Sequence, residues 1–155
     1  MTTVNLQQTV PDFELPSTGD KNIRLSDLHG KNVLIYFYPK DNTPGCTLEG
    51  QNFRDHIETF NAHNTLIFGI SRDSVRVHEN FKEKQQFPFD LLSDADETVC
   101  NLFGVMQLKK NYGREYMGIV RSTFLIDTEG KLINEWRNVK VKQHIDEVLD
   151  VVKNL

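Results

Sequence analysis

The chain has 155 residues, of which 38% are hydrophobic and 26% charged, the usual proportions of a globular protein with a real core. Its 18 basic and 22 acidic residues give a formal net charge of -4, which disfavours a general role on nucleic acid or anionic membranes, since those surfaces require clustered Lys and Arg. The longest apolar run, Val33 to Tyr38, is too short to span a bilayer, and Met1 to Gln8 has no secretory pattern. We therefore expect a single domain over residues 1–155, located in the cytoplasm.

The first part of the chain predicts a hairpin, a strand and a helix. Residues 13–15 and 23–25 flank a turn at 17–20, which is typical of a small β-hairpin. Residues 33–38 are short, apolar and rich in aromatic and branched side chains, which predicts a strand buried on both faces. A helix is expected from about Cys46 to His63, with its apolar residues spaced along one face.

The middle of the chain continues the alternation. Residues 65–70 predict a second buried strand, and residues 73–86 predict a polar surface helix anchored by Val77 and Phe81. Residues 87–92 are a third strand candidate, weakened by Pro88. Asp94 and Glu97 resemble a capping box for a following helix that carries Val99, Leu102 and Phe103. Tyr112 and Met117 are expected in a glycine-containing loop, as pocket-lining or packing residues.

The last part predicts a hairpin and a helix. Residues 122–126 and 132–136 flank the turn-forming residues 127–130. Residues 141–155 form an amphipathic helical pattern whose stripe ends at Val152 and Leu155. Early strand–helix–strand units imply parallel strands covered by helices, and the late hairpin adds antiparallel strands. The expected fold class is therefore α/β, with a mixed central sheet and an N-terminal β-hairpin.

The loop from Pro39 to Cys46 is the segment that suggests chemistry. It leaves a buried strand and enters a helix, so Cys46 is expected in the first helical turn. Free N–H groups and the positive end of the helix dipole favour an anion there, and thiols at such positions ionise more readily. Proline, glycine, asparagine and aspartate surround Cys46, which favours a reactive thiol over a core cysteine. Thr43 lies where its hydroxyl can bind the sulfur or a substrate.

The segment Thr43-Pro44-Gly45-Cys46 is similar to the redox motif of the thioredoxin superfamily, with one change. A thioredoxin-type motif has the form Cys-x-x-Cys, whereas threonine occupies the first position here. Dithiol exchange within the motif is therefore impossible, and a single activated thiol remains.

Three blocks together make the chain resemble the peroxiredoxins, and among them the bacterioferritin comigratory protein or PrxQ group. Pro39 to Cys46 fits the Pro-x-x-x-Thr-x-x-Cys pattern, residues 10–13 fit the opening of the family, and residues 110–127 fit its later block. The resemblance covers nearly the whole chain. It implies a thioredoxin-like three-layer α/β/α sandwich and a thiol-dependent peroxidase that reduces hydrogen peroxide and organic hydroperoxides.

The resemblance also assigns roles to five residues. Cys46 becomes the peroxidatic cysteine, which attacks the peroxide and becomes a sulfenic acid. Thr43 and Arg121 bind the peroxide and stabilise the charge that develops as the O–O bond breaks, and Pro39 shields the site from water. Glu49 helps to hold the arginine. Independently, a permanently charged guanidinium is suited to stabilising both a thiolate and a leaving oxygen anion.

The chain departs from the family where a second cysteine often stands. The position five residues after Cys46 is Gln51, and the alternative positions in the next helix, residues 80–84, contain no cysteine. Cys100 is the other thiol, and its place beside an apolar helical stripe predicts a buried, inert side chain. We therefore expect a one-cysteine cycle, with thioredoxin, glutaredoxin or a small-molecule thiol as reductant, in a protein that resemblance suggests is a monomer.

Two other functions remain open at this point. A thiol–disulfide oxidoreductase is disfavoured because Thr43 replaces the partner thiol. A redox sensor or chaperone that uses Cys46 only as a switch is not excluded. No metal, haem or flavin cofactor is implied. The five histidines show no spacing with cysteines or acidic residues that suggests a metal site.

Overall fold

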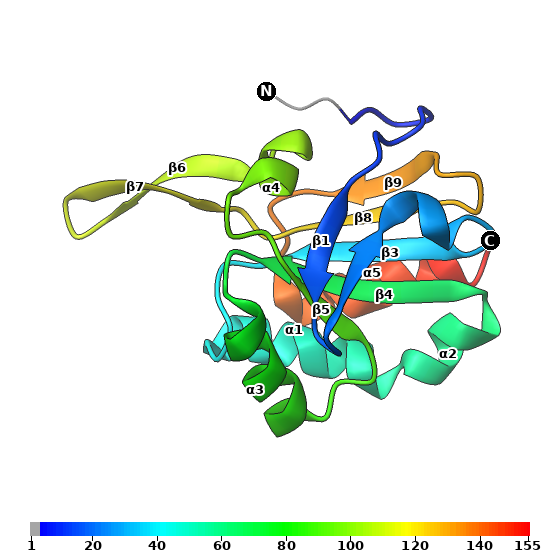
Figure 1. Ribbon diagram of the computed structural model, residues 1–155, viewed down its shortest axis with the longest axis horizontal. Helices are drawn as coiled ribbons and strands as arrows, with labels where there is room; N and C mark the ends of the chain where they lie inside the picture. Colours follow the sequence, from blue (N-terminus) through cyan, green and yellow to red (C-terminus); the bar gives the residue numbers. More distant parts are fainter. Residues whose placement is uncertain (1–3) are drawn as a thin grey trace.

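A mixed sheet of seven strands forms the centre of the computed structural model, which describes residues 4–155 (Figure 1). In chain order its strands are β1 (Glu14–Ser17), β2 (Lys21–Arg24), β3 (Asn32–Phe37), β4 (Thr65–Ser71), β5 (Asp90–Ser93), β8 (Ser122–Ile126) and β9 (Leu132–Trp136). They are arranged in the order β2-β1-β5-β4-β3-β8-β9. The β3–β4 and β4–β5 pairs are parallel and the others antiparallel. The predicted mixed sheet and N-terminal hairpin are confirmed.

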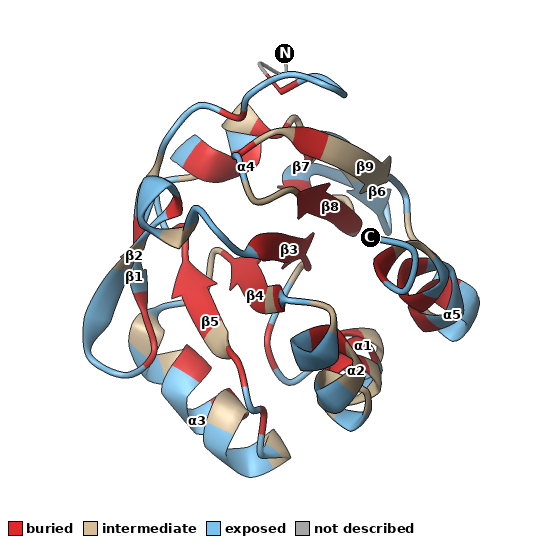
Figure 2. Cartoon of the chain, turned by 90° about the vertical axis from the view of Figure 1, so that its right-hand side faces the viewer, coloured by how far each residue is buried: buried red, intermediate tan, exposed pale blue. Residues whose placement is uncertain are grey.

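Helices cover both faces of this sheet (Figure 2). They are η1 (Leu25–Leu28, a 3₁₀ helix), α1 (Pro44–Asp55), α2 (Ile57–Ala62), α3 (Val75–Gln85), α4 (Thr98–Leu102) and α5 (Val141–Val152). Helices α1, α2, α3 and α5 lie on one face, and α4 lies on the other (Figures 1 and 2). This is the three-layer α/β/α arrangement that the family resemblance implies.

Strand β3 is buried on both faces, as its sequence predicts, because it separates two hydrophobic clusters. Its alternate side chains belong to different clusters. On the α4 face are Val33, Ile35 and Phe37; on the α1 face are Leu34, Tyr36 and, just beyond the strand, Tyr38. The strand is thus fixed from both sides, which fixes the starting point of the loop that follows it.

The predicted helix 46–63 is two helices. The first of them, α1, begins at Pro44 and not at Cys46. Proline suits the first helical turn because the backbone N–H groups there have no partner within the helix, so its missing N–H costs no hydrogen bond. The predicted helix is interrupted at His56, which ends α1 and precedes α2. In α3 the buried side chains are His78 and Phe81, while Val77 is only half-buried.

Two further predictions near the middle of the chain need correction. The third strand lies at Asp90–Ser93 instead of 87–92, and the residues before it supply the buried rings of Phe87 and Phe89, which stack on each other. The capping box before α4 does not form. Asp94 accepts from the backbone N–H groups of Val99 (3.2 Å) and Cys100 (2.6 Å), and Asp96 accepts from that of Thr98 (3.1 Å), whereas Glu97 pairs with Arg72.

The expected glycine-containing loop is in fact a second hairpin. Strands β6 (Met106–Asn111) and β7 (Arg114–Ile119) pair only with each other and project from the body as an arm (Figure 1). Tyr112 and Gly113 form its turn, both with positive φ, and Tyr112 is 98% exposed. Tyr112 therefore does not pack or line a pocket.

At the two ends of the chain, the structure limits two expectations. The apolar stripe of α5 ends at Val152, and Leu155 is exposed. Residues 1–3, at the start of the polar segment Met1 to Gln8, lie outside the described residues. No helix among residues 4–155 combines the length and apolarity needed to cross a bilayer.

A glycine in α1 allows this helix to pack against the chain before β5, which generates a stability prediction. A Cβ placed on Gly50 would lie 2.9 Å from Phe87 Cε1, inside the ring's contact distance. Gly50→Ala should therefore lower the free energy of unfolding by about 1–3 kcal/mol, despite the better helix propensity of alanine. Urea denaturation measures this loss.

The control is the same substitution in a Phe87→Ala background. With the ring removed, Gly50→Ala should become neutral or stabilising, because only the propensity term remains. Equal losses in both backgrounds would show that the ring is not the cause.

Candidate active site

Cys46 is the third residue of α1, the helix that follows the loop after the carboxyl end of β3. Thr43 is the N-cap residue with extended backbone angles, and Pro44 opens the helix. The free N–H groups and positive dipole end of α1 therefore lie beside the thiol, as the sequence predicts. Cys46 is only 2% exposed and belongs to the apolar cluster on the α1 face.

Arg121, which lies far from Cys46 in the sequence, contacts the sulfur. It lies between β7 and β8, and its Nη2 donates to Cys46 Sγ at 3.4 Å. Gly45 leaves the space for this guanidinium, since a Cβ at that position would lie 3.2 Å from Arg121 Nη2. The structure thus brings together two residues separated by 75 positions in the sequence.

Glu49 fixes the opposite edge of the same guanidinium. It lies one turn after Cys46 in α1, and its Oε1 accepts a hydrogen bond of 2.6 Å from Arg121 Nη1. Burial raises the pKa of Glu49 to about 7, although the nearby Arg121 charge acts in the opposite direction. For Arg121, burial lowers the pKa, but Glu49 and Cys46 outweigh it, so the net shift is upward.

Thr43 and Pro39 lie in or beside the loop but are not seen in contact with the sulfur. The Thr43 hydroxyl donates to the backbone oxygen of Lys40 at 2.8 Å, so its proton is not directed to Cys46. Its oxygen lone pairs remain able to accept a hydrogen bond from a substrate. Pro39 is half-buried directly after Tyr38, in the loop between β3 and α1.

Cys100 lies in the other layer of the fold. It is fully buried in α4 and belongs to the cluster on the α4 face, so the central sheet separates it from Cys46. Burial and the neighbouring Asp94 carboxylate raise the pKa of the Cys100 thiol. The position and chemistry of Cys100 are those of an inert core residue.

Other polar groups around the site were not singled out by sequence reasoning. Lys109 lies in β6 of the β6–β7 arm, where burial and then the charge of Arg121 lower its pKa. Asp41, in the loop before Cys46, forms a buried pair with His78 of α3. The available signal for this pair was a histidine three residues before Phe81, on the buried stripe of a polar helix.

Comparison with known proteins identifies close relatives. Residues 6–134 match the AhpC/TSA family. The chain is 50% identical over 153 residues to peroxiredoxin Bcp of Bacillus subtilis, covering 99% of this chain and 98% of the relative. It is 40% identical over 143 residues to peroxiredoxin Bcp of Escherichia coli, covering 92% of each chain.

Solved structures give the same result. Peroxiredoxin Q of Xanthomonas campestris superposes with a TM-score of 0.90 at 43% identity, covering 99% of this chain and 97% of the other. A mutant of Xylella fastidiosa PrxQ superposes with a TM-score of 0.93 at 39% identity, covering 99% and 98%. A further neighbour is the bacterioferritin comigratory protein of Xanthomonas campestris, whose structure is described for its alkyl peroxide reduction activity. It superposes with a TM-score of 0.90 at 42% identity, and the match covers 99% of this chain and 98% of the other.

The raised pKa of Glu49 predicts a pH dependence of stability. The folded protein keeps the proton up to about pH 7, whereas an unfolded chain releases it near 4.5. Glu49 therefore adds up to about 3 kcal/mol to the free energy of unfolding. This contribution is fully present below the pKa of Glu49 in the unfolded chain and is lost as pH rises through its pKa in the folded protein. Glu49→Gln should remove this part of the slope.

The measurement is urea denaturation of both proteins from pH 5 to pH 8. The free energy of unfolding of the variant, relative to wild type, should rise across this range, whatever its value at pH 5. A constant difference would show that Glu49 is already ionised at pH 5.

Proposed function

The chain belongs to the AhpC/TSA family, as a thiol-dependent peroxidase of the Bcp or PrxQ kind, and on this basis we propose that it reduces hydroperoxides through a Cys46 sulfenic acid that an external thiol resolves. One observation carries the assignment: the guanidinium of Arg121 donates to Cys46 Sγ while the buried Glu49 holds its other edge. The substrates are hydrogen peroxide and organic hydroperoxides, with alkyl peroxides supported by the activity described for the Xanthomonas relative.

In the first step the Cys46 thiolate attacks the terminal oxygen of the peroxide. An S–O bond forms, the O–O bond breaks, and the alkoxide or hydroxide leaves and takes up a proton. Negative charge moves from sulfur to the leaving oxygen, so a cation beside the sulfur stabilises both ends of the reaction. Arg121 supplies that charge, and the Thr43 oxygen can accept a hydrogen bond from the peroxide O–H group. Pro39 keeps water from the loop side of the site.

In the second step an external thiol attacks the sulfenic sulfur, releasing water and leaving a mixed disulfide. A second thiol then reduces this disulfide and restores Cys46. The burial of Cys100 on the opposite face of the sheet supports an external reductant, such as thioredoxin, glutaredoxin or a small-molecule thiol. We expect the protein to work as a monomer in this cycle, as the family resemblance suggests.

The role of Arg121 leads to a kinetic prediction. Arg121→Ala should slow oxidation of Cys46 by hydrogen peroxide by roughly 10²-fold, the usual effect of losing one preorganised donor at a developing charge. Arg121→Lys should be intermediate, because it keeps the charge but cannot bind the sulfur and Glu49 as a rigid fork. Stopped-flow fluorescence or competition kinetics would measure these rates, and a rate equal to wild type in Arg121→Ala would remove Arg121 from the mechanism.

The proposed cycle predicts the oxidised product. After one equivalent of peroxide without a thiol, intact mass spectrometry should detect one added oxygen on Cys46, and excess peroxide should add a second. Cys100→Ser should behave like wild type and turn over almost normally with a thiol donor. Cys46→Ser should be inactive, since a serine hydroxyl is not ionised near neutral pH.

Two results would contradict this proposal. Loss of two hydrogens with peptides joined at Cys46 and Cys100 would make Cys100 the resolving residue. More than a few per cent of wild-type turnover in Cys46→Ser would place the nucleophile elsewhere.

A further inference from the structure

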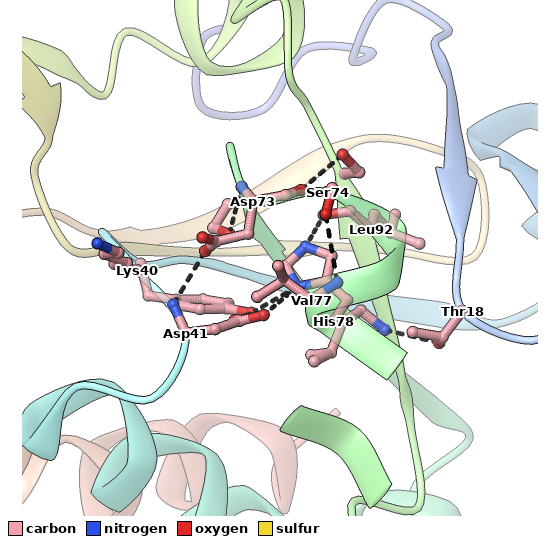
Figure 3. A network of polar contacts seen from close by, with 12 residues as sticks. Thr18, Lys40, Asp41, Asp73, Ser74, Val77, His78 and Leu92 are labelled. Atoms are coloured by element: carbon pink, nitrogen blue, oxygen red, sulfur yellow. Dashed lines mark hydrogen bonds and ion pairs between the residues drawn. The ribbon is translucent and has the colours of Figure 1, made fainter. Parts of the chain in front are cut away.

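A buried polar network holds the catalytic loop five residues before Cys46 (Figure 3). Asp41 and His78 have no exposed side-chain surface, and Asp41 Oδ2 lies 2.6 Å from His78 Nδ1. The other carboxylate oxygen, Oδ1, accepts a 2.5 Å hydrogen bond from the hydroxyl of Tyr38. Both oxygens of Asp41 are therefore engaged inside the protein.

The second ring nitrogen of His78 completes the link. Nε2 lies 2.9 Å from the backbone oxygen of Leu92 in β5, and a carbonyl oxygen can only accept. Nε2 must therefore carry a hydrogen, and one further proton is shared between His78 Nδ1 and Asp41 Oδ2. In either protonation state the bridge from the loop through α3 to β5 is intact.

The backbone of Asp41 is held by a separate contact. Its N–H donates to Asp73 Oδ2 at 2.9 Å, and that oxygen also accepts from the Ser71 hydroxyl at 2.7 Å. Ser93 holds the Asp73 backbone oxygen in turn. Asp41, Asp73 and His78 come close enough to one another to suggest a cation site, but the short Asp41–His78 bond already occupies the facing atoms. The group is a hydrogen-bonded clamp on the loop.

What the clamp controls is the entry to α1. After Asp41 comes Asn42, with a left-handed φ of 65°, and then Thr43, the N-cap of α1. The Thr43 hydroxyl donates to the oxygen of Lys40, the residue before Asp41. A shift of Asp41 would therefore move Thr43 and the first turn that carries Cys46.

We propose that His78 is a positioning residue of the peroxidase: through Nδ1 it holds Asp41, and through Asp41 it sets the geometry of Thr43 and Cys46. The proposal rests on the function proposed above, in which Cys46 is the nucleophile. A misplacement of about 1 Å at a reacting group can cost about 10²-fold in rate, so such a clamp has kinetic consequences without touching substrate.

Two substitutions of the same histidine separate positioning from stability. The amide nitrogen of His78→Asn lies near the place of Nδ1 and can still donate to Asp41, whereas that of His78→Gln lies near Nε2 and can donate only to Leu92. Each variant loses the ring and one hydrogen bond. The readouts are the rate of Cys46 oxidation by hydrogen peroxide and the free energy of unfolding.

We expect His78→Gln to slow oxidation by about 10- to 100-fold and His78→Asn by less than about 3-fold, at comparable stability. His63→Asn is the matched control, because the ring of His63 is hydrogen-bonded to the backbone oxygen of Thr59, in its own helical segment, and not to the catalytic loop. It should leave the rate unchanged. Equal rates in the Asn and Gln variants, or a slower Asn variant, would overturn the proposal.

If either His78 variant fails to fold, changes at Asp41 give the same answer. In Asp41→Asn the amide can donate to Nδ1 of a neutral His78 and still accept from Tyr38, so the rate should stay near wild type; Asp41→Ala should be slowed at least about 10-fold. Wild-type speed in Asp41→Ala, or equal loss in both variants, would overturn the proposal. Loss of the Cys46 assignment is recognised separately, by retained activity in Cys46→Ser.

Discussion

The guanidinium of Arg121 is the group on which the geometry of the site depends. One of its nitrogens donates to Cys46 Sγ and another to Glu49 Oε1, and the two acceptors lie one turn apart in α1. Because Glu49 is buried, its bond to Arg121 has no competition from water, and the planar fork is held in a single orientation. The charge directed at the sulfur is thus fixed before substrate arrives, which is the condition for effective electrostatic stabilisation.

The elements that could be predicted from the sequence are those whose buried residues follow a regular pattern. Strand β3 is buried on both faces and reads as a continuous apolar run, and α5 has a regular stripe up to Val152. The β6–β7 arm has no such pattern, because most of its residues are exposed on both sides and its turn, Tyr112-Gly113, is not one of the common hairpin pairs. The capping box predicted before α4 fails at Glu97, which pairs with Arg72 in a tertiary contact that local spacing does not reveal.

The candidate site divides along the same line. The placement of Cys46 and Thr43 at a helix N-terminus is local and could be predicted from the loop sequence alone. Arg121 and Glu49 depend on a long-range contact, so composition and spacing gave no reason to join them, and only the family resemblance did. For the Asp41–His78 pair, spacing indicates at most that His78 is buried, because its partner in the loop is brought against it only by the fold.

The separation of the two thiols by the sheet has a consequence for how the proposed cycle closes. Gln51, where the resemblance places a second cysteine, donates instead to Gln85 at 3.0 Å and ties α1 to α3. Arg54 adds a second tie to the backbone of Gln85, so the oxidised sulfur stays in a helix held against its neighbour. The side chain of Arg121 is 16% exposed, which marks the side from which the buried sulfur can be reached. We therefore expect a small-molecule thiol, or a protein thiol on a narrow projection, to reduce Cys46 more readily than a thiol on a flat protein surface, because Cys46 is only 2% exposed.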